Sequence, residues 1–409
     1  MNRTYIQIFE ILKKVYGNHA YLGLILDNAD FGNDRSFALR IIYGVIEKDT
    51  EFEYHLGYLC KKRPKLALRI ILKIGMYMIK YMDSIPEYTA VNETVELAKE
   101  LKKSENAGFI NSVLRSFIKD KNRLPSDPLE KLSVSESVPL WLCRKYKEQY
   151  SESEIGSIIN FGEKLTHIRV NSLKYTLNEF YSFLRDLGCA FVKSNVGAFI
   201  KNTSCCSELI SEGKVFIQSL GSIRICDAFK AKFASDGEYK ILDMCSAPGG
   251  KTVYLAENFP NSSVVALELY DNRINLIENY LENSGVENVQ VFQYDSTLYN
   301  PKYENSFDMI LCDVPCMGLG VVSSNPDILL HRKEEELRSI TKTQNAILQN
   351  AAKYLKQEGM IVYSTCSTLK EENHYLTDEF CQIYGFIKGD ELINIKESGE
   401  FFYLCRITK

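Results

Sequence analysis

The sequence predicts a multidomain protein with an all-α domain, a small α+β region and an α/β domain built on a doubly wound parallel sheet. Through residues 1–122, apolar side chains recur at steps of three and four, which is typical of helices. From residue 236 onward, short apolar runs alternate with helical patterns, which is typical of βα units. The 409 residues suffice for two or three domains of roughly 100–200 residues each. We expect domains at residues 1–125, 130–235 and 236–409.

The N-terminal domain shows helical spacing almost throughout and no alternating strand pattern, as in the series Tyr5, Ile8, Phe9, Leu12 and Val15. Residues 121–128 contain two prolines and are expected to form a linker. The domain also carries a basic group, namely Lys61, Lys62, Arg63, Lys65 and Arg69. This group indicates either a surface that binds RNA or protein, or a solvated loop and helix face, and the sequence leaves both open.

The later elements are predicted from the change in periodicity. In the middle region we expect a strand at residues 167–171 and a helix at 177–187. In the C-terminal domain we expect strands at residues 239–244, 263–268, 289–292, 307–312 and 360–363. The intervening helices are expected at residues 251–258, 272–284, 334–355 and 371–383. Residues 386–395 and 401–407 are expected to close the sheet as an antiparallel pair.

Composition and charge exclude several classes of protein. Twelve cysteines without a secretory signal indicate reduced thiols in the cytoplasm, and the absence of a CxxC pair argues against a zinc or other metal site. The most apolar stretch, residues 66–82, is interrupted by basic side chains, so we expect a core helix and no membrane span. The net charge of −4 argues against a protein that coats nucleic acid, although a local basic face can still serve RNA.

A loop between a predicted strand and helix, residues 243–251, indicates a nucleotide-cofactor site. Its two glycines allow close approach of a ligand to the backbone, and the helix start offers free N–H groups. Glu268 ends the next strand, where an acid can bind ribose hydroxyls, and Asp295 ends the third, where an acid can bind an adenine amino group. The chain lacks both the GxGxxG spacing and the GK[ST] phosphate loop. The set therefore favours S-adenosylmethionine over NAD or ATP, although Gly249-Gly250 alone is more often a simple tight turn and Glu268 alone is more often a solvated acid.

Two cysteines lie just beyond predicted strands, Cys316 in Asp313-Val314-Pro315-Cys316 and Cys366 in Ser364-Thr365-Cys366-Ser367. A cytosine becomes nucleophilic at carbon 5 when a thiolate adds to carbon 6, an acid near N3 neutralises the developing charge, and a base later removes the carbon 5 proton. Cys366, Asp313 and Cys316 fit those needs. Small buried hydrophobes are expected at Cys60, Cys143, Cys189, Cys226, Cys312, Cys381 and Cys405. Cys205-Cys206 is expected to be structural.

These motifs resemble those of the RsmB (Sun/Fmu)-type ribosomal RNA small-subunit methyltransferases, within the NOL1/NOP2/Sun family of RNA cytosine-5 methyltransferases. Residues 168–171, Ile-Arg-Val-Asn, are similar to a segment that precedes the family's catalytic domain, and residues 91–98 and 108–115 resemble its NusB-like RNA-binding domain. The resemblance spans nearly the whole chain. It implies a Rossmann-like methyltransferase domain, S-adenosylmethionine as donor, small-subunit (16S) ribosomal RNA as partner, and a cytoplasmic monomer without metal.

The resemblance also implies a role for each matching residue. Cys366 is expected to be the nucleophile, Cys316 to assist product release, and Asp313 to contact both cytosine and donor. Glu268 is expected to hold the donor ribose and Asp295 its adenine. The remaining donor-binding residues are expected to be Cys245, Ser246, Ala247, Pro248, Gly249, Gly250 and Lys251.

Some residues depart from the family pattern. Met317 stands where a small serine is usual, residues 321–327 lack basic side chains often found there, and Ser219 follows Gln218 where an aspartate is common. These departures concern RNA affinity and the target cytosine. Two alternatives stay open: the same chemistry on transfer RNA, or a non-catalytic RNA-binding factor for ribosome assembly.

Overall fold

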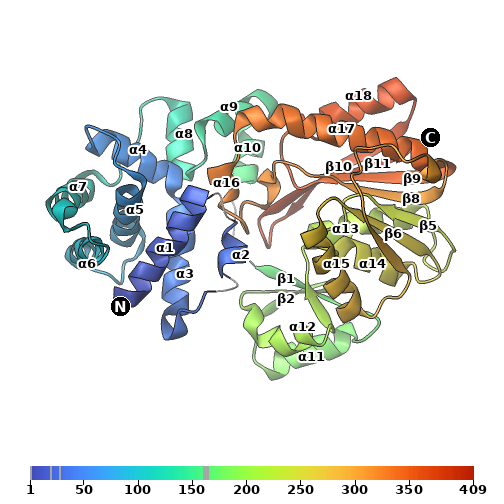
Figure 1. Ribbon diagram of the computed structural model, residues 1–409, viewed down its shortest axis with the longest axis horizontal. Coiled ribbons are helices and arrows are strands. Elements are labelled where there is room, and N and C mark those ends of the chain that lie inside the picture. The colour runs from blue at the N-terminus through green and yellow to red at the C-terminus, as the bar shows by residue number, and fades with distance from the viewer. Residues whose placement is uncertain (1, 19–20, 27–28, 160–164) are drawn as a thin grey trace. The chain divides into compact units, whose positions relative to one another are not determined.

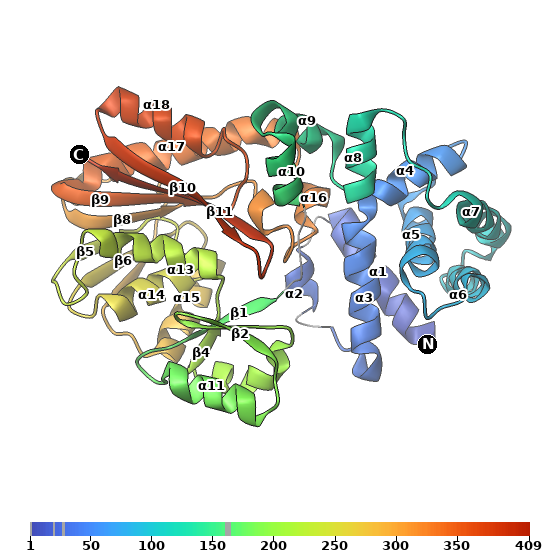
Figure 2. The same ribbon diagram turned by 180° about the vertical axis from the view of Figure 1, so that it is seen from behind.

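A computed structural model describes residues 2–18, 21–26, 29–159 and 165–409 of the chain (Figure 1; the view from behind is Figure 2). The chain divides into two compact units. The first comprises Met1–Ile159 with Asn325–Glu334, and the second comprises Asn160–Ser324 with Glu335–Lys409. The boundaries predicted at residues 125 and 235 stay predictions.

The regular structure in the described residues of the first unit consists of helices, as predicted for residues 1–122. Helices α1, α3, α4, α6 and α7 pack against α5 (Leu66–Tyr81), which is buried from Ile70 to Ile79. Apolar side chains of α1, α3 and α5 share one core, which includes Ile8, Ile41 and Ile74. The other helices are α1 (Asn2–Asn18), α2 (Leu22–Leu26), α3 (Arg35–Glu47), α4 (Asp49–Leu59), α6 (Glu87–Glu100), α7 (Ala107–Asp120), α8 (Pro128–Glu136), α9 (Leu140–Gln149), α10 (Glu152–Ile159) and α16 (Ile328–His331). None of the described helices of the protein is both long and apolar enough to cross a membrane.

The second unit begins with a four-stranded antiparallel sheet in the order β2-β3-β1-β4. Its strands are β1 (Thr166–Val170), β2 (Phe191–Ser194), β3 (Gly197–Ile200) and β4 (Val215–Ile217), accompanied by α11 (Leu177–Asp186) and α12 (Ser207–Ser211). Helix α11 starts at a capping box in which Thr176 and Glu179 exchange hydrogen bonds. The prediction found β1 and α11 but missed the other three strands, which have only three or four residues each.

The larger sheet has seven strands in the order β10-β11-β9-β8-β5-β6-β7. Its strands are β5 (Lys240–Asp243), β6 (Ser263–Glu268), β7 (Val289–Gln293), β8 (Phe307–Asp313), β9 (Leu355–Thr365), β10 (Ile387–Ile395) and β11 (Glu400–Thr408). Strands β5 to β9 pair in parallel, and β10 and β11 close one edge antiparallel. The α/β fold and the closing antiparallel pair are therefore confirmed.

Helices cover both faces of this sheet (Figures 1 and 2). The buried residues of its strands accordingly divide between two hydrophobic cores, one on each face. Ile241, Met309 and Val362 face a core shared with α13 (Leu220–Asp227) and α14 (Gly250–Asn258). The neighbouring strand residues face a second core, shared with α17 (Leu337–Tyr354) and α18 (His374–Tyr384). Helix α15 (Asp271–Ser284) lies between β6 and β7 in the chain and ends at Gly285, whose φ is +81°. The layers leave the carboxyl ends of the central strands accessible, where ligands bind in such sheets.

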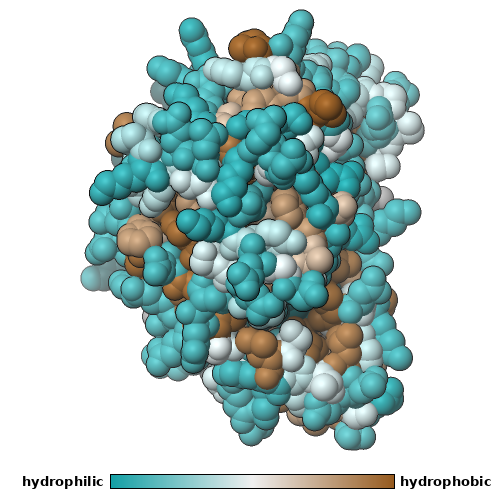
Figure 3. All heavy atoms as spheres, turned by 90° about the vertical axis from the view of Figure 1, so that its right-hand side faces the viewer, coloured by the Kyte–Doolittle hydropathy of each residue, from teal (hydrophilic) through white to brown (hydrophobic). Residues whose placement is uncertain are grey.

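The exposed surface carries no single dominant apolar face in the view of Figure 3. Hydrophobic side chains lie there singly or in small groups among hydrophilic ones. Such scattered exposure is ordinary for folded proteins.

Candidate functional site

The two predicted cysteines lie together at the carboxyl ends of adjacent strands. Strands β8 and β9 pair so that Asp313 lies opposite Ser364, and Cys316 and Cys366 follow these strand ends. Their Sγ atoms are 3.3 Å apart. Both side chains are partly exposed, whereas Cys60, Cys143, Cys206, Cys226, Cys312, Cys381 and Cys405 are buried. The fold therefore separates one accessible thiol pair from those buried cysteines.

Asp313 connects the thiol pair to residues 243–251, the loop predicted to bind the methyl donor (the donor loop). One carboxylate oxygen accepts a hydrogen bond from the Ser364 hydroxyl at 2.8 Å, and the other lies 2.7 Å from Lys251 Nζ. Burial on its own would lower the pKa of Lys251, but the Asp313 charge outweighs it and raises that pKa above its ordinary value. Lys251 therefore remains a cation at neutral pH.

The two sulfurs have different electrostatic surroundings. The hydrogen bond with Cys366, burial and the Glu372 charge together hold the pKa of Cys316 well above its ordinary value. By contrast, Cys366 is among the groups that interact electrostatically with the Lys251 ammonium. Cys316 therefore remains a neutral thiol at neutral pH.

The donor loop runs from the end of β5 to the start of α14. Gly249 caps the helix with a φ of +113°, and a Cβ atom there would lie 3.2 Å from the Ile277 backbone, so the position requires glycine. Ser246 N donates to Leu267 O at 3.0 Å, which fixes the loop against β6. Behind the loop, burial raises the pKa of Asp243 to about 6, and its carboxylate accepts from the Thr252 hydroxyl at 2.7 Å.

A cavity of about 200 Å³ lies against this loop. The loop and Asp313 form one wall, with Cys245, Ser246, Ala247, Pro248, Gly250 and Lys251. The other wall comes from β4, α13 and α15, through Ile217, Gln218, Ser219, Ser222 and Tyr280. Sequence reasoning did not predict this second wall, because nothing in the pattern of residues 217–222 signals contact with a loop about thirty residues downstream.

Two predicted acids, Glu268 and Asp295, lie at neighbouring strand ends and do not line that cavity. Glu268 is only 4% exposed; its Oε1 accepts from Tyr270 N at 3.1 Å, and its Oε2 lies 3.4 Å from Ala247 N of the donor loop. Asp295 Oδ1 accepts from the backbone and hydroxyl of Thr297. The structure therefore brings Glu268 to the donor loop and places Asp295 one strand further along.

The segment containing Arg169 braces the site from behind. Arg169 is buried and forms an ion pair with Glu257 on α14, and its Nε donates to Gln218 Oε1 at 2.7 Å. Gln218 Nε2 in turn donates to Gly250 O at 3.1 Å. Asn171 Nδ2 donates to the carbonyls of Gly213 and Ser284. These contacts hold the four-stranded sheet against α14. Replacing only one partner of the buried Arg169–Glu257 ion pair would leave the other charge buried and unpaired, which is costly.

His167 on the same strand provides a pH-dependent contribution to stability. Burial lowers the pKa of its imidazole to about 4, and its Nδ1 and Nε2 each lie 2.7 Å from an oxygen, of Gln218 and Ser194 respectively. The unfolded chain binds this proton near pH 6.5, so between pH 6.5 and pH 4 the unfolded state binds more protons than the folded state. We expect the free energy of unfolding to fall on acidification through this window, by about 3 kcal/mol from this group.

The measurement is urea unfolding at pH 7 and at pH 4.5, for the wild type and for His167→Gln. The variant should lose less of its stability between the two pH values. An equal loss in both proteins would contradict the assignment of a neutral, buried imidazole.

Residues of α17 and the loop before α18 hold the cysteine loops, and sequence reasoning missed them. The buried Asn373 Nδ2 donates to Ser367 O at 2.8 Å, and its Oδ1 accepts from the Thr365 hydroxyl at 2.6 Å. The buried Gln344 Nε2 donates to Pro315 O at 2.9 Å and to Glu372 Oε1 at 3.0 Å. Helix α18 was predicted to start at residue 371 but starts at His374, because Glu372 and Asn373 turn toward the cysteine loops.

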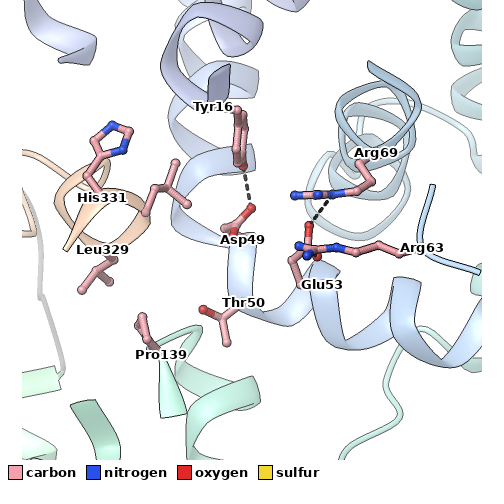
Figure 4. Close-up of a pocket in the computed structure, with 10 residues that line it drawn as sticks. Tyr16, Asp49, Thr50, Glu53, Arg63, Arg69, Pro139, Leu329 and His331 are labelled. Atoms are coloured by element: carbon pink, nitrogen blue, oxygen red, sulfur yellow. Dashed lines mark hydrogen bonds and ion pairs between the residues drawn. The ribbon is translucent and has the colours of Figure 1, made fainter. Parts of the chain in front are cut away.

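The first unit has a separate cavity of about 370 Å³, shown in Figure 4. Its charged residues are already paired: Glu53 binds Arg69 at 3.0 Å and Arg63 at 2.9 Å, and Asp49 accepts from the Tyr16 hydroxyl at 2.6 Å (Figure 4). Arg63 and Arg69 of the predicted basic group are therefore ion-paired, whereas Lys61, Lys62 and Lys65 are exposed. Across the described residues of the protein, no three His, Cys, Asp or Glu side chains are grouped to hold a metal ion.

Comparisons with known proteins agree with this geometry. Residues 232–392 match the family described as 16S rRNA methyltransferase RsmB/F, and residues 3–119 match the NusB family. Among solved structures, PH0851 has a TM-score of 0.81 at 19% identity, covering 100% of this chain and 98% of that chain. NSun6 from Pyrococcus horikoshii, solved with SFG, has a TM-score of 0.58 at 19% identity, covering 67% of this chain and 99% of that chain. At these identities the likeness concerns the fold.

Curated relatives match along almost their whole length. "Ribosomal RNA small subunit methyltransferase B" of Photorhabdus laumondii is 31% identical over 397 residues, 92% of this chain and 91% of that protein. "Probable ribosomal RNA small subunit methyltransferase B" of Bacillus subtilis is 29% identical over 394 residues, 91% of this chain and 87% of that protein. The chain therefore belongs to the RsmB/F family of ribosomal RNA small-subunit methyltransferases.

Proposed function

We propose that this methyltransferase converts a cytosine of 16S ribosomal RNA to 5-methylcytosine through a covalent bond between Cys366 and carbon 6 of the base. The observation that carries the proposal is the thiol pair, 3.3 Å apart at the carboxyl ends of β8 and β9 and connected through Asp313 to the donor loop. The chain's membership of the family supports ribosomal RNA as substrate and S-adenosylmethionine as donor.

The residues around the donor loop fit S-adenosylmethionine. Gly250 lines the cavity, Gly249 forms the turn against Ile277, and Glu268 at the end of β6 carries a carboxylate of the kind that binds two ribose hydroxyls. We assign Asp295 to the adenine amino group and the residues from Cys245 to Lys251 to the methionine part. The bound sulfonium supplies the methyl group, and no phosphate cradle is needed for it.

The thiols and Asp313 perform the chemistry on the base. The Cys366 thiolate, beside the Lys251 cation, adds to carbon 6, and Asp313 provides the polar contact near N3 that stabilises the charge developing on the ring. Carbon 5 then takes the methyl group. Cys316, a neutral thiol beside Cys366, assists transfer of the carbon 5 proton to water, after which the carbon–sulfur bond breaks and Cys366 leaves as the thiolate. The target base must be unpaired or flipped out, because the thiol attacks the face of its ring.

The deciding experiment maps 5-methylcytosine at single-base resolution in RNA from cells with and without the gene. A position in 16S ribosomal RNA should lose its mark, and the purified protein should restore it. If the mark is lost from transfer RNA instead, transfer RNA replaces ribosomal RNA as the proposed substrate. If no mark is lost, the result favours a non-catalytic assembly factor. An enzyme that acts on ribosomal RNA is expected in the cytoplasm. A monomer suffices for the proposed site, because all the residues of the site come from one chain.

Glu268 offers a test of the donor site that requires no RNA. Replacing it with alanine removes hydrogen bonds from ribose hydroxyls to a charged group, each worth about 1.5–3 kcal/mol. We expect isothermal titration to show binding of S-adenosylmethionine weakened by about 10- to 100-fold. The matched control is Glu282→Ala on α15, an exposed acid, which should bind the donor as the wild type does. Equal affinities for both variants would contradict the ribose assignment.

A further inference from the structure

Glu372 is a buried acid that the mechanism above does not use. Its side chain is 0% exposed, and it lies six residues after Cys366, just before α18. Burying a carboxylate is costly unless hydrogen bonds satisfy its oxygens. The groups that satisfy Glu372 therefore show what the acid is for.

Its carboxylate connects both cysteine loops. Oε1 accepts from Met317 N, the residue after Cys316, at 2.9 Å. Oε2 accepts from the hydroxyl of Ser367, the residue after Cys366. A single side chain thus contacts the neighbour of each reactive thiol, on loops that come from two different strands.

A third contact fixes the acid itself. Gln344 Nε2 on α17 donates to Glu372 Oε1 at 3.0 Å and to Pro315 O at 2.9 Å, so the Cys316 loop is held from both sides. The Tyr363 hydroxyl on β9 donates to Glu372 O at 2.7 Å, which anchors the backbone of the acid. The two cysteine loops, whose sulfurs are 3.3 Å apart, are therefore held by a buried hydrogen-bond network.

From this arrangement we propose that Glu372 is a positioning residue, which holds Cys316 and Cys366 in register and keeps its negative charge on the Cys316 side of the pair. The inference rests on the proposed function, since it assigns regulation of protonation within the same site. The titratable and charged groups around Cys316 are Cys366, Glu372 and Tyr363, with the Lys251–Asp313 pair on the side of Cys366. Glu372 thus opposes ionisation of Cys316, whereas the Lys251 ammonium interacts with Cys366.

The test compares two substitutions that separate the effect of the Glu372 charge from the effect of the length of its side chain. Glu372→Gln removes the charge and keeps the size, whereas Glu372→Asp keeps the charge and shortens the side chain by one methylene. Both should lower kcat for RNA methylation by up to about 10²-fold through misplaced thiols. Both should bind S-adenosylmethionine as the wild type does, which also shows that they fold. The matched control is Glu379→Gln, an exposed acid on α18, which should retain full activity.

A second readout needs neither RNA nor donor. Iodoacetamide alkylation of Cys316 and Cys366 is followed against pH by mass spectrometry of their separate peptides. In Glu372→Gln the midpoint for Cys316 should fall by about one pH unit, because a nearby negative charge is gone. In Glu372→Asp the midpoint should stay near that of the wild type.

The possible outcomes distinguish this inference from the proposed function. Unchanged kcat in Glu372→Gln, or a Cys316 midpoint that shifts equally in both variants, would overturn the role of the acid. If the wild type methylates no cytosine, the proposed function fails, and the alkylation profile still decides whether Glu372 controls the two thiols.

Discussion

Replacing Cys366 with serine is expected to reduce RNA methylation by about 10⁴-fold or more, as loss of a nucleophile does in other enzymes. The serine hydroxyl stays protonated at neutral pH and cannot add to carbon 6 of the base, so carbon 5 never becomes nucleophilic. The fold should tolerate the change, because Cys366 is partly exposed and its loop is held by Thr365, Ser367 and Asn373. The measurement is transfer of labelled methyl from S-adenosylmethionine to RNA.

The matched control is Cys205→Ser, a partly exposed cysteine in the small-sheet region. It should leave methyl transfer within about twofold of the wild type, since surface changes away from a site usually alter little. Both variants should bind S-adenosylmethionine normally by isothermal titration. Full turnover by Cys366→Ser would refute the assignment of Cys366 as the nucleophile. The thiol of Cys316 would then be the candidate nucleophile.

The sequence was sufficient to predict where the thiols lie, because strand order and side-chain position follow from simple patterns. Apolar runs at residues 309–312 and 360–363 predicted two strands, which end at Asp313 and Thr365 in the structure. The carboxyl ends of parallel strands meet at one edge of a sheet. Which strands become neighbours depends on the order of all the strands in the sheet, and the two apolar runs alone do not predict it. The separation of the Cys316 and Cys366 sulfurs therefore comes from the structure alone.

The residues that support the thiols could not be predicted in the same way. Gln344 lies in the middle of a long amphipathic helix, and in the sequence it looks like any polar residue of such a helix. Glu372 looks like the first turn of α18, where an acid is ordinary. Only the packing of α17 and α18 against one face of the sheet turns both side chains inward.

Glycine 320 shows a different limit of sequence reasoning. From the sequence alone, Gly318 and Gly320 predict that the loop after Cys316 passes close to a flat base. In the structure Gly320 N donates to Cys366 O at 2.8 Å, and a Cβ atom there would lie 2.1 Å from Phe401 O. The glycine therefore allows two segments of the protein to approach each other, and it supports the loop that carries Cys366.

The small sheet was missed because its strands are too short to show a period. Strand β2 has four residues with little burial, and β3 is buried on all four, so neither alternates. Its connection to the donor loop runs through Arg169 and Gln218, which are 32 or more residues from Gly250. Such contacts are fixed by tertiary packing, and the motif around Arg169 acquires its meaning only there.

Replacing Cys316 with alanine is expected to trap the enzyme on its substrate. Cys366 can still add to the base and methyl transfer can still occur, but removal of the carbon 5 proton loses its assisting group. A positioned acid–base group contributes about 10²–10⁴-fold to such a step, so turnover should fall by that factor while the covalent adduct accumulates. The adduct is measured as a protein–RNA band that survives denaturing electrophoresis and disappears after ribonuclease treatment.

The double variant Cys316→Ala, Cys366→Ser separates a covalent adduct from tight binding. It should form no such band, because the bond requires the Cys366 sulfur, even though the loop geometry around Glu372 is retained. The trapped complex of Cys316→Ala should contain one methyl group per RNA, since the block follows methyl transfer. An adduct without methyl would place the block before transfer, and rapid turnover without any adduct would remove Cys316 from product release altogether.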